Sequence, residues 1–141
     1  MLRSRTFKEH GQSLVELALM FTLLLVLLAG AVDFGRAFFT WLSLRDAAQE
    51  GAAYGSIAPE NLAEIDERIY ANLDEMNIPR GDLVLTVTFF GPPCLGSMIQ
   101  VDVNYPEFPL TMPFLSTVIG QDFIAIHATV NDTILRPSDC P

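Results

Sequence analysis

The chain has 141 residues, of which 50% are hydrophobic and 18% are charged, and its formal net charge is −9. That length allows one compact domain with an additional segment, and it excludes a polytopic transporter or a multidomain enzyme. The hydrophobic excess is local, because 16 of the 19 residues from 14 to 32 are apolar. We therefore expect a membrane-type segment joined to a soluble domain.

Charge is divided along the same border. Residues 1–11 carry three basic residues and one acidic residue, whereas residues 12–141 carry a net charge of −11. So acidic a body is repelled by phosphate backbones, which argues against nucleic-acid binding. Basic residues beside an apolar run stay on the cytoplasmic side, so we expect a single-pass protein of the cytoplasmic (inner) membrane with its N-terminus inside.

The first predicted element is a long helix. Leu17–Val32 holds no charge, and as a helix it would span about 24 Å, against a hydrocarbon core of ~30 Å. The first 58 residues contain no proline, so we expect one continuous helix from Leu14 to about Ser56, transmembrane over about 14–32. A secretory signal also has a basic end and a short apolar run. The unbroken helix beyond the run and the acid inside it, Glu16, argue against one here.

Glu16 is the first candidate functional residue, because a carboxylate in hydrocarbon is costly and usually has a partner. Gly11 lies five residues before it, at the border between the basic end and the apolar run. The sequence from His10 to Leu17, HGQSLVEL, resembles the prepilin processing signal of type IV pilin-like proteins. The alternative is that Glu16 lies at the headgroup boundary and that the spacing from Gly11 is coincidental.

The resemblance to this signal implies processing. A prepilin peptidase would cut between Gly11 and Gln12 on the cytoplasmic face and remove residues 1–11 as a leader. Glu16 would become the fifth residue of the mature chain. Its carboxylate would neutralise the new amine of Gln12 in a neighbouring subunit and so set the register between subunits.

The next segment extends the resemblance. An Asp-x-Gly-Arg step, Asp33–Arg36, and an Ala-rich stretch, 47–53, follow the apolar run. Together with the start from Gly11 to Glu16, these motifs resemble the TadE-like family of the tight-adherence (Tad/Flp) pilus systems over about residues 10–56. The resemblance implies a minor pilin or pseudopilin that packs through its N-terminal helix with other pilin-like subunits. The Tad assembly machinery would be a further partner, and surface adhesion the purpose.

The helix beyond the membrane has a predicted packing face. Its members recur at spacings of three and four residues, and they are Ala37, Trp41, Leu44, Ala48, Ala52 and Gly55. We expect this face to pack against the chain's own domain. Asp33 and Arg36 lie one helical turn apart and can pair at the membrane exit, where we expect a solvated ion pair rather than a recognition site.

Residues 57–141 predict an extracytoplasmic α+β head. Pro59-Glu60-Asn61 is expected to open a second helix that continues to about Met76. Stretches rich in β-forming residues predict a small antiparallel sheet with strands at 83–90, 98–105 and 123–130. A sheet this small needs a cover, for which the outer half of the long helix is available. Prolines 106, 109 and 113 predict an irregular crossover, with a short helical turn at 114–119.

The sequence contains two cysteines. Cys94 lies in the predicted hairpin loop and Cys140 beside the C-terminus, so we expect a disulfide on the extracytoplasmic side. Two reduced thiols, or pairing with another chain, are the alternatives.

No Gly-x-Ser-x-Gly, phosphate-binding glycine loop, Cys-x-x-Cys or metal-ligand spacing occurs, so the sequence predicts neither an enzyme nor a cofactor. The alternative to a pilin is a permanently anchored protein whose head binds a partner or ligand.

Overall fold

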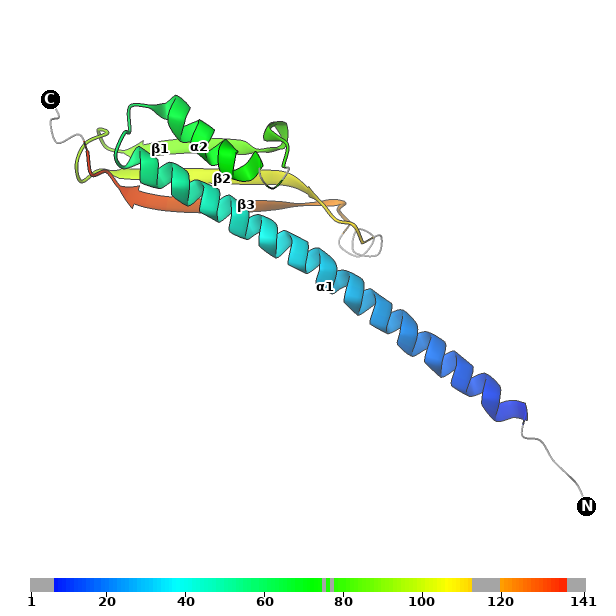
Figure 1. Cartoon of the computed structure of the whole chain (residues 1–141). Coiled ribbons are helices and arrows are strands. Elements are labelled where there is room, and N and C mark those ends of the chain that lie inside the picture. The colour runs from blue at the N-terminus through cyan, green and yellow to red at the C-terminus, as the bar shows by residue number, and fades with distance from the viewer. Residues whose placement is uncertain (1–6, 75, 77, 113–119, 137–141) are drawn as a thin grey trace, which may run out of the picture.

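The computed structural model describes residues 7–74, 76, 78–112 and 120–136. Its elements are, in chain order, α1 (Phe7–Gly55), α2 (Leu62–Asp74), the 3-10 helix η1 (Arg80–Asp82), β1 (Val84–Phe90), β2 (Met98–Pro109) and β3 (Phe123–Thr133). The predicted α+β fold is confirmed, with a long N-terminal helix, a second helix and an antiparallel sheet. The sheet and α2 gather around the C-terminal part of α1, and the rest of α1 projects away from them (Figure 1).

Both helices differ from the predicted boundaries. α1 begins at Phe7 rather than at Leu14, because the residues between them include no proline and the helix continues through Gly11, a poor helix former. In α2 the predicted opening residues lie outside the helix, and Asn61 caps it: the side-chain oxygen accepts a hydrogen bond from the backbone N–H of Glu64 at 3.3 Å. α2 ends at Asp74, two residues earlier than predicted.

The sheet has the order β1-β2-β3, and each neighbouring pair is antiparallel. β2 continues to Pro109 instead of ending at Tyr105, and its pairing with β3 is irregular between Tyr105 and Phe108. Pro106 and Pro109 therefore lie within the end of a strand, where a local irregularity accommodates the missing N–H donor of Pro106, and Pro113 lies outside the described residues. β3 extends to Thr133, three residues beyond its predicted end. The predicted helical turn at 114–119 lies outside the described residues.

One core joins α1, α2 and one face of the sheet. Its fully buried members are Leu44, Ala47, Ala48, Ala52, Ile65, Ile69, Leu73, Ile99, Val101, Val103 and Ile134. Glycines permit the close approach of the helices, because a Cβ atom at Gly51 would lie 2.5 Å from Cγ1 of Ile69. A Cβ atom at Gly55 would overlap Ile99 of β2. The outer part of α1 therefore needs small residues where it meets α2 and the sheet.

The predicted packing face of α1 is correct except at one position. Leu44, Ala48 and Ala52 are buried, but Trp41 is 37% exposed and does not belong to the core. Ala47 is buried in addition, since the face of a straight helix follows a period of 3.6 residues and drifts around the axis. Trp41 instead contacts Phe38 on a side of α1 that the sheet does not cover.

Candidate functional site

The part of α1 that carries the predicted processing residues is not covered by the head. Residues 11–28 are all exposed, among them Gly11, Gln12 and Glu16. Of the described helices, α1 is the one long and apolar enough to cross a membrane, and none of its most apolar window is buried. The roles of these three residues remain predictions. Their exposure leaves them accessible to lipid or to another protein.

Asp33, in contrast, is buried, with only 4% of its surface exposed. Its carboxylate accepts hydrogen bonds from the backbone N–H groups of Thr111 at 3.3 Å and of Met112 at 2.8 Å. The hydroxyl of Thr111 donates a third hydrogen bond to the same carboxylate. These donors lie directly after β2, far away in the sequence, so the carboxylate fastens this segment to α1.

Arg36 provides the fourth donor to Asp33. Its Nη1 lies 3.1 Å from Oδ1 of Asp33 and 2.6 Å from the hydroxyl oxygen of Thr111. The guanidinium also lies 5.2 Å from the ring centre of Phe108 in β2. Four donors and an opposite charge offset the cost of removing the carboxylate from water. Asp33, Arg36, Thr111 and Met112 are called the helix–loop joint below.

The helix–loop joint corrects one expectation and adds two residues. Asp33 and Arg36 form an ion pair, but the expectation that the pair is solvated was wrong for Asp33. Sequence reasoning missed Thr111, because a single threonine in an irregular segment has no periodic signal. Met112 was not recognised as a donor, since its contribution comes from the backbone. The position of the pair at the membrane exit remains a prediction.

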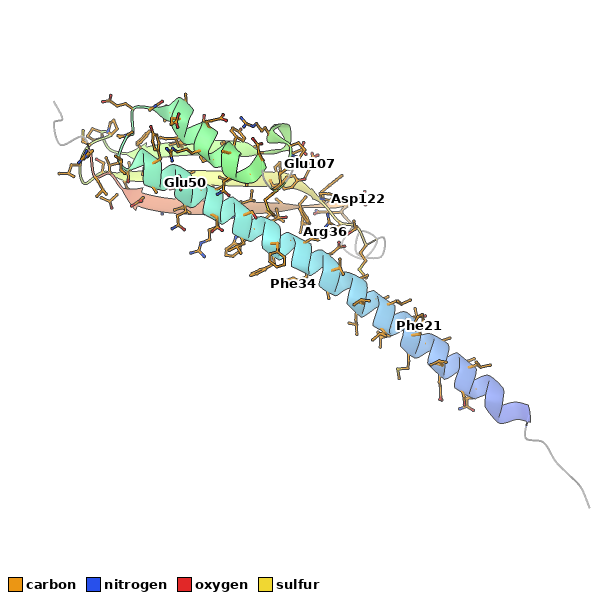
Figure 2. All side chains as sticks on the ribbon, in the orientation of Figure 1. Phe21, Phe34, Arg36, Glu50, Glu107 and Asp122 are labelled. Carbon is orange, nitrogen blue, oxygen red and sulfur yellow. The ribbon has the colours of Figure 1, made fainter. Side chains whose placement is uncertain are left out.

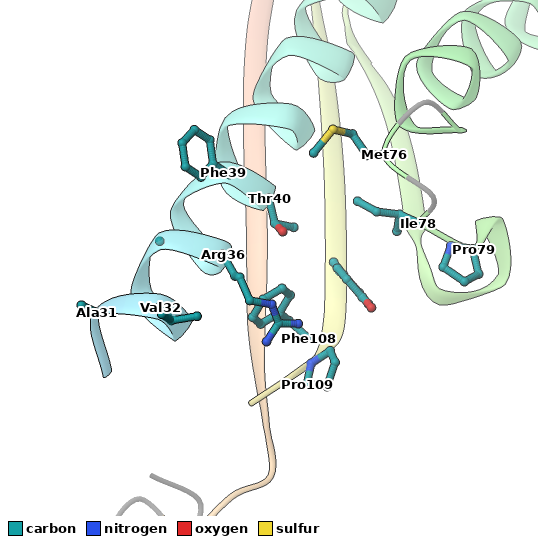
Figure 3. A pocket seen from close by; sticks show the side chains of 12 residues that line it. Ala31, Val32, Arg36, Phe39, Thr40, Met76, Ile78, Pro79, Phe108 and Pro109 are labelled. Atoms are coloured by element: carbon teal, nitrogen blue, oxygen red, sulfur yellow. The ribbon is translucent and has the colours of Figure 1, made fainter. Parts of the chain in front are cut away.

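An open groove of about 540 Å³ lies beside the helix–loop joint, between α1, the α2–β1 connection and β2 (Figure 3). Its lining is largely apolar and consists of Ala31, Val32, Gly35, Arg36, Phe39, Thr40, Met76, Ile78, Pro79, Tyr105, Phe108 and Pro109. Burial raises the pKa of the Tyr105 hydroxyl above its ordinary range. Among the described residues, the lining includes no carboxylate, thiol or imidazole.

Two acidic residues of α2, Glu67 and Asp74, form ion pairs with Arg80 at the surface of the head. Arg80 lies 3.1 Å from Glu67 and 2.6 Å from Asp74. Hydrogen bonds from Arg80 hold the pKa of both carboxyls below the usual range, so both are ionised at neutral pH and unsuited to act as general acids. Among the described residues there is no group of three or more His, Cys, Asp or Glu that could bind a metal.

The predicted disulfide cannot be followed to its second cysteine, because Cys140 lies outside the described residues. The hairpin loop that contains Cys94 nevertheless contacts the end of β3. The N–H of Gly96 donates to the carbonyl of Ile134 at 2.9 Å, and the N–H of Ile134 donates to the carbonyl of Ser97 at 2.8 Å. The loop and the start of the C-terminal segment are therefore neighbours, and the Cys94–Cys140 bridge stays a prediction.

Comparison with known protein families gives a match to the part of α1 that includes the exposed apolar residues and, from the helix–loop joint, Asp33 and Arg36. The family described as TadE-like protein matches residues 11–53, which begin at Gly11 and include Glu16, Asp33 and Arg36. Over this segment the chain is similar to TadE-like proteins. The match confirms the resemblance seen in the motifs and indicates a minor pilin-like protein associated with a Tad pilus. No curated protein and no solved structure matches the chain.

The TadE-like segment covers 43 of the 141 residues and ends two residues before the end of α1. It therefore contains the exposed apolar part, the first two residues of the helix–loop joint and the small residues that pack against α2 and the sheet, except Gly55. The partners of those residues, Thr111, Met112 and Ile69, lie in the head beyond the match. The match accordingly covers most of α1, and the structure shows which residues of the head contact this helix.

Proposed function

We propose that the chain is a minor pilin or pseudopilin that takes part in the assembly of a Tad-type pilus. The observation that carries the proposal is the TadE-like match over a helix whose apolar part is exposed throughout residues 11–28. Large apolar side chains left uncovered by the chain's own head need another apolar environment. The bilayer provides it before assembly, and the helices of other pilin-like subunits provide it in the fibre.

The proposal divides the chain into three parts. Residues 1–11 are a cytoplasmic leader, residues 12–56 are the long helix, transmembrane over about 14–32, and residues 57–141 are the extracytoplasmic head. A prepilin peptidase cuts after Gly11. Glu16 then pairs with the new amine of Gln12 in a neighbouring subunit, because an unpaired carboxylate among apolar helices is unfavourable.

N-terminal sequencing of the protein from purified pili tests cleavage and incorporation together. The expected mature N-terminus is Gln12. Recovery of the intact Met1 end from cells with an active prepilin peptidase contradicts processing. Absence of the protein from sheared fibres, while it remains in membrane fractions, contradicts incorporation and favours a permanent anchor whose head binds a partner.

The assembly role of Glu16 is tested with Glu16→Ala. We expect loss of the protein from sheared fibres, with normal amounts in the membrane. Glu60→Ala removes an exposed carboxylate from the head and is the matched control, which should leave incorporation unchanged. Equal incorporation of the Glu16→Ala and Glu60→Ala proteins would show that Glu16 has no part in assembly.

A further inference from the structure

Aromatic side chains directly after the apolar run are left uncovered by the head. Phe34 and Phe39 are 73% and 63% exposed, and Phe38 and Trp41 are 48% and 37% exposed. The ring centre of Phe38 lies 6.1 Å from those of Phe39 and Trp41 and 6.4 Å from that of Phe34. Phe34 points away from the head, on the side of α1 opposite to Arg36 (Figure 2). These four residues are called the aromatic patch.

The aromatic patch extends the apolar surface to the thickness of a whole bilayer. As a helix, Leu14 to Val32 covers about 28 Å, slightly less than a hydrocarbon core of ~30 Å. Leu14 to Trp41 covers about 40 Å, which matches a bilayer with its headgroup regions at ~40–45 Å. Arg45 and Asp46 follow in the next turn, so the exposed side of α1 becomes charged only beyond the patch.

The charged residues at the level of the aromatic patch are already paired within the chain. Asp33 is buried and receives four hydrogen bonds, one of them from Arg36. Thr111 and Met112 line a second open groove together with residues of the apolar run, among them Leu25, Leu28 and Val32. The end of the head therefore reaches alongside the apolar run, and the sequence holds no charged residue between Glu107 and Asp122.

We propose that the aromatic patch lies in the phospholipid headgroup layer on the extracytoplasmic side, so that α1 is immersed as far as Trp41 rather than Val32. Phospholipid is the occupant, because the patch continues the lipid-facing surface and the charge at its level, Arg36, is paired with Asp33. Trp41, whose indole carries a polar N–H, favours this layer, and the three phenylalanines contribute apolar area. Arg45, whose guanidinium lies 5.8 Å from the ring centre of Trp41, can bind a lipid phosphate at the outer border.

Trp41 is the chain's only tryptophan, so its fluorescence reports this position alone. The inference rests on the membrane insertion in the proposed function. The full chain is reconstituted into phosphatidylcholine–phosphatidylglycerol vesicles that carry bromine either near the headgroups or near the ends of the acyl chains. We expect bromine near the headgroups to cause the larger loss of Trp41 emission, and aqueous acrylamide to cause little.

A second variant separates this inference from membrane insertion itself. Leu24→Trp combined with Trp41→Phe places the only tryptophan in the middle of the apolar run, where bromine near the chain ends should quench it most. If neither brominated lipid quenches this variant, membrane insertion fails and the inference fails with it. If this variant is quenched, the chain is inserted, and the quenching of Trp41 in the unmodified chain then tests the inference by itself. Quenching of Trp41 by acrylamide would place the patch in water. Protection from all quenchers would mean that a second copy or another protein covers it, and either result overturns the inference.

Discussion

The two parts of α1 share one backbone conformation and differ in what their side chains contact. Residues 11–28 carry mainly leucine and other large apolar residues, and all of them are exposed. Between 44 and 55 the buried positions are mostly alanine and glycine, and they pack against α2 and the sheet. With the exception of Leu44, the large apolar residues of the helix therefore lie outside the protein core, and the small ones lie inside it.

The comparison teaches that hydrophobicity along a helix does not by itself locate the protein core. Large side chains keep neighbouring backbones apart, whereas Ala48, Gly51 and Ala52 allow α2 and the sheet to approach closely. Large exposed side chains suit a fluid apolar environment that adapts to their shape. The helix–loop joint at Asp33 lies between the two parts and marks where the contacts of the head begin.

The largest expected difference between the two parts concerns the stability of the head. Ile69→Ala removes a fully buried side chain that packs against Gly51, and we expect it to lower the free energy of unfolding by about 3 kcal/mol. Leu24→Ala truncates an exposed side chain of the apolar part and should change it by less than about 0.5 kcal/mol. Denaturant unfolding in detergent micelles, followed by circular dichroism, measures both. Equal effects would show that the apolar part of α1 also stabilises the head.

A smaller effect is expected at the border between the parts. Asp33→Asn preserves the size of the side chain but directs an NH₂ group toward hydrogen-bond donors, and we expect a loss of about 2 kcal/mol. Hydrogen exchange should also show faster exchange of the amides of Thr111 and Met112. Asp46→Asn changes an exposed carboxylate of the same helix and is the control. Unchanged exchange at both amides would refute the helix–loop joint.

The smallest expected effect compares two glycines of α1. Gly51→Ala introduces a methyl group against Ile69, and the crowding should exceed the gain in helix propensity, for a net loss of about 1 kcal/mol. Gly35→Ala meets no atom within 4 Å and should stabilise the helix by up to about 1 kcal/mol. Thermal unfolding in micelles measures both shifts. Destabilisation by the two substitutions to the same extent would contradict the packing account.

Local patterns in the sequence predicted most elements of the fold. The absence of proline before Pro59 indicated the unbroken long helix, and alternation at Ile99, Val101 and Val103 indicated the buried face of β2. These signals are local because backbone hydrogen bonds and side-chain period act over a few residues. Motif spacing also indicated the TadE-like family, which the match over residues 11–53 confirms.

Exposure of individual residues was predicted less well. Trp41 fits the spacing of a packing face but is partly exposed, and Asp33 fits a solvated pair but is buried. In both cases the outcome depends on where the sheet and the segment after β2 lie around α1. A helical pattern defines the relative directions of side chains and not the direction from which the rest of the chain approaches.

The sequence by itself determined a long apolar helix, an acidic α+β head and the resemblance to TadE-like proteins, because each of these depends on neighbouring residues. Only the tertiary structure decided that Asp33 fastens the head to the helix. Its donors at Thr111 and Met112 are almost eighty residues away in the chain, and two of the hydrogen bonds come from backbone N–H groups, which every residue but proline possesses. No pattern of side chains predicts a contact to backbone N–H groups, and this contact forms only when the sheet packs against α1.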